Sequence, residues 1–307
     1  MTAAIQPPVT ARLAATIMLL REAPGGPETL LVRRHGAIAF MGGVWVFPGG
    51  KLEPSDTADE ALASVPAAAR QRCEAWAAGS QRPCSSREAS GLYVAACRET
   101  FEEAGVLLAR RPDGAPFPAA EVARVRDERV EIAARPAAFS EVLRREGLRL
   151  DPGLVPWAHW VTPSLERIRF DARFFAAALD GDHEVVPDAT ESTGHAWMRP
   201  ADALAAYERG DLVLAGPTVI TLAEAAASLA AHGSVAALLA AEAGRPIVPI
   251  VPRLRRDAGG VTAYLPWDPE YEGLEGEGGP VGDAIPARLR AFPSRMALPR
   301  AERRIVR

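Results

Sequence analysis

The chain has 307 residues, of which 48% are hydrophobic and 24% charged, proportions typical of a soluble globular protein with a sizeable core. Lys and Arg together number 35 against 39 Asp and Glu, a net charge of −4 that lacks the basic excess of nucleic-acid-binding proteins. No stretch approaches the ~20 apolar residues that span a bilayer, so we expect no membrane partner. The cysteines, Cys73, Cys84 and Cys97, are too few and too irregularly spaced for a disulfide framework or a zinc site. With no signal-peptide pattern at the N-terminus, these features predict a cytoplasmic protein.

Three apolar runs of strand length open the chain. Residues 12–20 and 29–34 flank the turn signal at 24–27 and are predicted to form a β-hairpin. Residues 44–47 predict a third short strand, which ends at Pro48-Gly49-Gly50. Residues 57–90 then become rich in Ala, Ser, Arg and Gln, which predicts a partly helical insertion.

Helices and strands alternate through the rest of the chain. We expect a helix over residues 92–105, closed by Gly105 in the left-handed conformation. Further strands are predicted at 157–162, 172–179 and 194–198, and further helices at 119–147 (broken near Pro136), 200–209 and 218–243 (broken near Gly233). From Pro246 the chain is rich in Pro and Gly, and we expect an irregular tail, packed on the domain or partly mobile. This order favours the α/β (α+β) class, a sandwich of a mixed sheet and flanking helices.

Three carboxylates on the helix predicted over 92–105 are the strongest chemical signal. Glu99, Glu102 and Glu103 stand at i, i+3 and i+4, so they share one face, while apolar residues occupy the opposite face. Like charges this close repel one another, and a divalent cation would offset the repulsion. Mg²⁺ prefers carboxylate oxygens and keeps waters that can bridge to phosphates. The alternative is a solvated acidic helix face with no bound ion.

The segment Arg98 to Val106 (RETFEEAGV) resembles the second half of the Nudix box, and Gly50 matches its first half. Five residues separate Gly50 from Asp56, which stands where the family has Glu. Residues 57–97 lie between Asp56 and Arg98, where the family's box has only seven residues. The chain therefore resembles the branch that contains the peroxisomal acyl-coenzyme A diphosphatases, whose box holds a long insertion. A signature of coenzyme A-cleaving members is matched in part, at Leu30, Leu31, Arg34, Gly43 and 47–50, with Ala39 in place of an Arg.

The resemblance implies a Nudix-type α/β/α sandwich with a mixed sheet. It implies a domain over residues 10–245, with a helical insertion at about 57–91 inside the box and a C-terminal extension over 246–307.

The resemblance also implies roles for individual residues. Glu99, Glu102 and Glu103 would bind Mg²⁺, with Mn²⁺ as a substitute, and Arg98 would pair with one of those carboxylates. Water would attack one phosphorus of a diphosphate, and Glu103 or Glu99 would accept its proton, with Glu191 as the alternative base from a later loop. The predicted substrate-binding residues are Arg33, Arg34, Phe47, Gly49 and Gly50.

Several other side chains have two readings. Phe40, Met41 and Trp45 are candidates for an acyl or pantetheine pocket, but residues of this type more often belong to the core. His159, His183 and His195 lack metal-ligand spacing, so we interpret them as structural.

The implied function is Mg²⁺-dependent cleavage of the pyrophosphate bond in coenzyme A or acyl-coenzyme A, giving 3′,5′-ADP and (acyl-)4′-phosphopantetheine. ADP-ribose, NADH and nucleoside triphosphates are alternative substrates for the same chemistry. A Nudix-fold binding module without catalysis is the alternative from another class. The partner we expect is a small nucleotide-type molecule, and a homodimer is possible.

Overall fold

A mixed eight-stranded sheet forms the centre of the computed structural model, which describes residues 9–36, 42–180, 183–188, 192–258 and 260–298. Phe40, Met41 and Glu191 lie outside these residues. The sheet order is β10-β7-β8-β1-β2-β3, with β4 paired to β1 and β9 paired to β2. The strands are β1 (Arg12–Arg21), β2 (Glu28–Arg34), β3 (Trp45–Val46), β4 (Gly49–Lys51), β7 (Val155–Val161), β8 (Phe170–Ala178), β9 (Ser192–Met198) and β10 (Pro249–Ile250). The β1–β8 and β7–β10 pairs are parallel and the other pairs are antiparallel.

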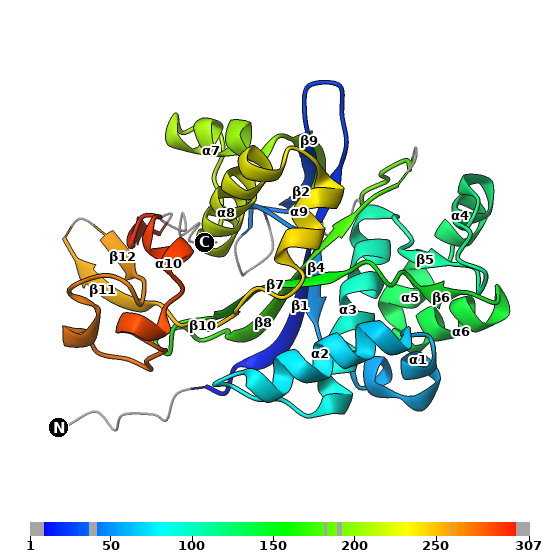
Figure 1. The fold of residues 1–307 in the computed structure, drawn as a ribbon, viewed down its shortest axis with the longest axis horizontal. Helices are drawn as coiled ribbons and strands as arrows, with labels where there is room; N and C mark the ends of the chain where they lie inside the picture. Colours follow the sequence, from blue (N-terminus) through cyan, green and yellow to red (C-terminus); the bar gives the residue numbers. More distant parts are fainter. Residues whose placement is uncertain (1–8, 37–41, 181–182, 189–191, 259, 299–307) are drawn as a thin grey trace, which may run out of the picture.

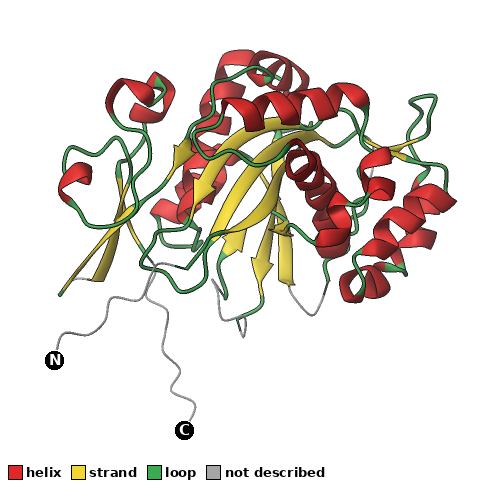
Figure 2. Ribbon diagram, turned by 90° about the horizontal axis from the view of Figure 1, so that it is seen from below, coloured by secondary structure: helices red, strands yellow, loops and turns green. Residues whose placement is uncertain are grey.

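Alternation along the central strands divides the core into two layers. On β1, Ile17 and Leu19 face one hydrophobic cluster, whereas Met18 and Leu20 face another. Because neighbouring side chains of a strand point to opposite faces, each face of the sheet must be covered, and helices lie on both (Figures 1 and 2). The predicted sandwich class, the hairpin between β1 and β2 and the later strands are confirmed.

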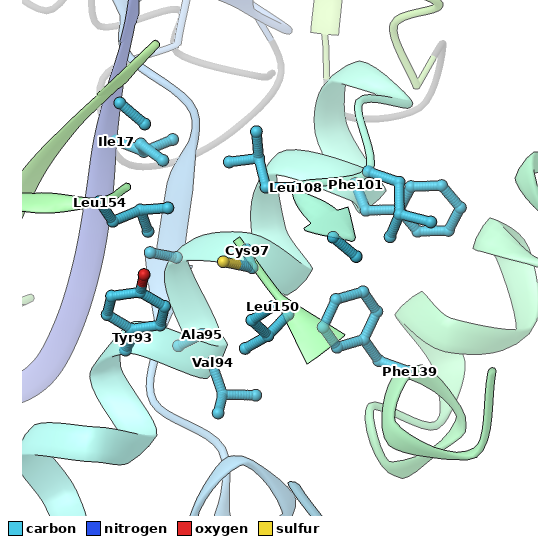
Figure 3. Close-up of a cluster of buried hydrophobic side chains, with 14 of the residues drawn as sticks. Ile17, Tyr93, Val94, Ala95, Cys97, Phe101, Leu108, Phe139, Leu150 and Leu154 are labelled. Carbon is cyan, nitrogen blue, oxygen red and sulfur yellow. The ribbon is translucent and has the colours of Figure 1, made fainter. Parts of the chain in front are cut away.

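The first layer is built around α3 (Ser86–Ala104). The helix begins six residues before its predicted start, because Ser85 and Glu88 form a reciprocal capping box. It ends as predicted at Gly105, whose φ of 69° is left-handed. Figure 3 shows its apolar face, including Cys97 and Phe101, packed among side chains from β1 and from the helix that carries Phe139.

Short helices surround α3 in the same layer. The insertion supplies α1 (Asp59–Ala63) and α2 (Ala67–Gly79), after the 3₁₀ turn Pro54–Thr57, as its composition predicted. The segment predicted as helical over 119–147 consists of α4 (Ala119–Arg126), α5 (Arg129–Ala134) and α6 (Ala137–Arg145), flanked by the paired strands β5 (Ala109–Arg110) and β6 (Arg149–Leu150). The predicted break near Pro136 is present, and a second break follows α4.

The second layer contains α7 (Pro200–Glu208), α8 (Gly216–His232) and α9 (Val235–Glu242), with the predicted break at Gly233. No single helix in the described part of the chain is long and apolar enough to cross a membrane; the bent pair α8 and α9 passes that test by length and composition alone.

The tail packs on the domain, as expected, but the prediction that it is irregular is wrong. β10 extends the main sheet, and β11 (Arg253–Asp257), β12 (Gly260–Tyr264) and β13 (Arg295–Ala297) form a second sheet beside it (Figure 1). The short helix α10 (Ala287–Arg290) also belongs to the tail. Leu265, Ile285, Leu289 and Met296 of the tail are buried in the second core cluster. Burial of these side chains explains why a segment rich in Pro and Gly is ordered.

Candidate active site

Arg98 is the centre of a buried ion cluster on α3. Its Nε and Nη2 donate to Oδ1 and Oδ2 of Asp56 at 2.8 and 2.9 Å. Its Nη1 donates to Oε1 of Glu99 at 2.9 Å and to Oε1 of Glu102 at 2.8 Å. Nη2 also donates to the carbonyl oxygen of Lys51 at 3.1 Å, which fixes the guanidinium to β4. The prediction that Arg98 pairs with one of the three glutamates is confirmed, and it pairs with two.

Asp56 is the site residue to which sequence reasoning gave no role. Its side chain and that of Arg98 are each only 2% exposed, and the bidentate pairing satisfies both charges. Burial disfavours the charged form of Arg98, but its hydrogen bonds to Asp56 and the nearby carboxylates hold the pKa of Arg98 above its usual range. The signal was present in the sequence, because Asp56 stands where the resemblance to the Nudix box places an acidic residue, with five residues between it and Gly50.

The side chain of Glu99 extends from α3 toward Gly50 of β4. A Cβ atom on Gly50 would come within 2.4 Å of its carboxylate, so glycine is required for this close approach. Burial raises the pKa of Glu99 to about 7, although the charge of Arg98 acts in the opposite direction. A further positive charge nearby would stabilise the ionised form of this carboxylate.

Glu103 is held by the other glycine of the pair. Its Oε2 accepts a hydrogen bond from the Gly49 backbone N–H at 3.0 Å. A Cβ atom on Gly49 would lie 2.4 Å from the carbonyl oxygen of Ala15, so this glycine allows β4 to pack closely on β1. The two glycines therefore bring the turn after β3 into contact with the helix that carries the glutamates.

The chemistry of this donor set fits a hard divalent cation. Glu99, Glu102 and Glu103 supply carboxylate oxygens within two turns of one helix, and Glu99 and Glu103 are buried there. In the described part of the chain, however, no three His, Cys, Asp or Glu side chains already converge on one ion-sized space. Each of the three carboxylates instead accepts a hydrogen bond from Arg98 or Gly49.

The other predicted site residues are distributed more widely. Arg33 is exposed and Arg34 half-buried at the end of β2, and the Nε of Arg34 has no hydrogen-bond partner among the described residues. Phe47 is buried in the second core cluster, so the structure does not bring it to the carboxylates. Trp45 packs against the same cluster, in keeping with a core role. His159 is fully buried and bonded to Asp171 at 2.7 Å, which fits the structural interpretation.

Comparison with solved structures gives the class of protein. The crystal structure of a Nudix hydrolase from Alicyclobacillus acidocaldarius is similar, with a TM-score of 0.60 and 26% sequence identity, covering 78% of this chain and 99% of that one. The mixed sheet with helices on both faces is therefore a Nudix hydrolase fold.

Comparison of the sequence gives the branch. The model of the NUDT19 Nudix domain matches residues 10–224, and the chain belongs to this family of Nudix hydrolases. Acyl-coenzyme A diphosphatase NUDT19 of Gallus gallus is 30% identical over 253 residues, which cover 67% of this chain and 65% of the relative. The Homo sapiens protein of the same name is 28% identical over 219 residues, covering 62% of this chain and 58% of the relative. The chain thus matches 65% and 58% of the length of these two curated relatives.

Proposed function

We propose that this chain hydrolyses the pyrophosphate bond of coenzyme A or acyl-coenzyme A, releasing 3′,5′-ADP and (acyl-)4′-phosphopantetheine. The observation that carries the proposal is the Arg98-centred cluster, which orients Glu99 and Glu102 beside the Gly49-Gly50 turn. The choice of substrate is supported by the curated relatives, which are named acyl-coenzyme A diphosphatases.

The chain's own residues supply positioning and acid–base groups. Asp56 fixes the plane of the Arg98 guanidinium, and Arg98 in turn limits the rotamers of Glu99 and Glu102. Glu99, held by Arg98, is the candidate to accept a proton from the attacking water, with Glu103 as the alternative base. Arg34, with its unpartnered Nε, is the candidate contact for a substrate phosphate, together with Arg33.

Glu99, Glu102 and Glu103 would hold Mg²⁺, with Mn²⁺ as a substitute. When bound, the ion would neutralise phosphate charge and lower the pKa of a water molecule.

A substrate panel tests the proposal. The full chain is incubated with coenzyme A, an acyl-coenzyme A, ADP-ribose, NADH and a nucleoside triphosphate, with Mg²⁺ or with a chelator, and the products are separated by chromatography. We expect metal-dependent release of 3′,5′-ADP from the coenzyme A compounds. Preferential turnover of another nucleotide would replace the substrate while keeping the chemistry.

A Glu102→Gln variant separates an enzyme from a binding module. Glu102 is only 13% exposed and its Oε1 accepts from Arg98, so the neutral amide should remove a charge from the site without opening the fold. We expect kcat to fall by about a hundredfold or more, which is the typical loss when one charged or hydrogen-bonding group that stabilises the transition state is removed. Glu121→Gln, which alters an exposed carboxylate paired with Arg111, is the matched control and should keep wild-type activity. Equal turnover by wild type and Glu102→Gln on every substrate would contradict catalysis at this site.

A further inference from the structure

The C-terminal end of α3 is covered by the segment 183–188, which follows β8. The backbone N–H of Val186 donates to the carbonyl oxygen of Ala104 at 2.9 Å, and that of Asp188 donates to the carbonyl oxygen of Glu103 at 3.0 Å. These carbonyls are among the last of the helix and have no partner within it. The segment therefore caps the helix at the residue whose carboxylate binds the Gly49 backbone.

Two arginines hold this segment from its other side. Arg126 is the last residue of α4 and Arg129 the first of α5, so the bend between the helices places both beside Gly105. Nη1 of Arg126 donates to the Glu184 carboxylate at 2.9 Å, and its Nη2 donates to the Glu184 carbonyl at 3.2 Å. Nη1 of Arg129 donates to the carbonyl oxygen of Val186. The segment is thus bonded through its N–H groups to α3 and through its carbonyls to the arginines.

Gly105 allows the arginines to come this close. A Cβ atom at this position would lie 3.1 Å from Cδ of Arg126 and 3.3 Å from Nη1 of Arg129. Burial and the neighbouring Arg126 charge lower the pKa of Arg129, while the charge of Asp188 acts against the shift. Two half-buried guanidinium groups close together repel each other and lose hydration, which costs free energy. Their hydrogen bonds to the segment offset that cost.

We infer that Arg126 and Arg129 are positioning residues for hydrolysis: they clamp residues 184–188 onto the end of α3 and so fix where Glu103 lies. The inference rests on the proposed function. Arg126 and Arg129 donate to Glu184 and Val186 of the segment, whose backbone in turn donates to the end of α3, so this backbone carries their effect to Glu103. Small displacements of a catalytic group reduce turnover strongly, because reaction requires a narrow range of geometry.

The test combines kinetics with hydrogen exchange on the full chain. For Arg129→Ala and for Arg126→Ala/Arg129→Ala we expect kcat to fall by about tenfold or more while KM changes little. We also expect faster amide exchange at 184–188, with β1 and β8 exchanging as in wild type. Arg124→Ala, which removes an exposed arginine of α4 paired with Glu146, is the matched control and should leave both measurements unchanged.

A lysine variant tests the inference if the alanine variants do not fold. Arg126→Lys retains charge but cannot donate from two nitrogens to Glu184 at once, so we expect an intermediate loss of kcat and intermediate exchange. Wild-type kcat with wild-type exchange in all the Arg126 and Arg129 variants would overturn the inference, as would a lost kcat without faster exchange at 184–188. If wild type hydrolyses no substrate while the variants still exchange faster at 184–188, the proposed function fails and the clamp stands.

Discussion

Gly50 leaves the space that the Glu99 carboxylate occupies. The atoms that a Cβ would meet, at 2.4 to 2.5 Å, are all at the end of the Glu99 side chain, which can rotate away. We therefore expect Gly50→Ala to change the free energy of unfolding by less than about 1 kcal/mol, in the range of ordinary single substitutions. Turnover should nevertheless fall by about a hundredfold, because Glu99 is displaced. Urea unfolding and steady-state kinetics measure the two effects.

Gly79→Ala is the matched control, since a Cβ there meets nothing within 4 Å. It should keep both stability and turnover. A Gly50→Ala enzyme with wild-type kcat would mean that the position of Glu99 beside β4 does not matter for catalysis.

At the same scale, the sequence was sufficient to predict part of the site. The i, i+3, i+4 spacing placed Glu99, Glu102 and Glu103 on one helix, and the structure has them there. The sequence could not predict that Asp56 pairs with Arg98, because 42 positions separate the two residues and the fold of the insertion is what brings them together. Phe47 was assigned to substrate by its motif position, but strand alternation turns it into the other core layer.

At the scale of elements, strands β7 and β8 share a buried charge cluster. His159 is bonded through Nε2 to Oδ1 of Asp171 at 2.7 Å, and Arg82 of the insertion donates to Oδ2 at 3.1 Å. Arg173, beside His159 in the strand register, also contacts Asp171 at 3.3 Å. Burial lowers the pKa of His159 to about 4, against the opposing effect of Asp171, so the imidazole is neutral at neutral pH and Nε2 carries the donated hydrogen.

The pKa shift of His159 predicts a loss of stability in acid. In the unfolded chain this histidine should titrate near pH 6.5, whereas the folded chain binds the proton only near pH 4. Protonation therefore favours unfolding in this window: the contribution is complete above about pH 6.5 and is lost as the pH falls to 4. The size is about 3 kcal/mol. Below pH 4, protonation of Asp171, whose pKa lies well under its usual value, removes more.

Urea unfolding between pH 7 and 4 would measure this loss. His159→Gln, whose amide can still donate to Asp171, should show a flatter pH dependence than wild type, whereas His195→Gln, which changes an exposed histidine, should not. Parallel pH curves for wild type and His159→Gln would rule out His159 as the source.

Element boundaries show where sequence reasoning failed and why. The early start of α3 could have been found, because Ser85 and Glu88 stand three residues apart, as a capping box requires. The strands of the tail could not, because β11 carries three arginines and an aspartate among its five residues. These charges interrupt the alternation of apolar and polar residues that predicts a strand. The arginines stack on the aromatic rings of Tyr264 and Tyr271, and such tertiary contacts cannot be read from the sequence.

At the scale of the whole molecule, the tail completes one of the two core layers. The family model ends at residue 224, yet Leu265, Ile285, Leu289 and Met296 pack in the cluster that contains Trp157 and Trp160. Arg288 of the tail also donates to Glu224 of α8 at 3.0 Å, inside a buried ion cluster shared with Arg245. A boundary drawn from sequence at residue 245 therefore crosses a continuous core.

A chain that ends at residue 245 should consequently not fold stably, because it exposes the apolar face that β10 and α10 cover. We expect such a chain to lose its cooperative thermal transition and to aggregate in size-exclusion chromatography. In the full chain, Leu289→Ala, at a site only 2% exposed, should lower the free energy of unfolding by about 2–5 kcal/mol. Leu165→Ala, at a site 52% exposed, is the matched control and should change it by less than about 0.5 kcal/mol. A soluble, cooperative fragment together with a neutral Leu289→Ala would show that the tail only decorates the fold.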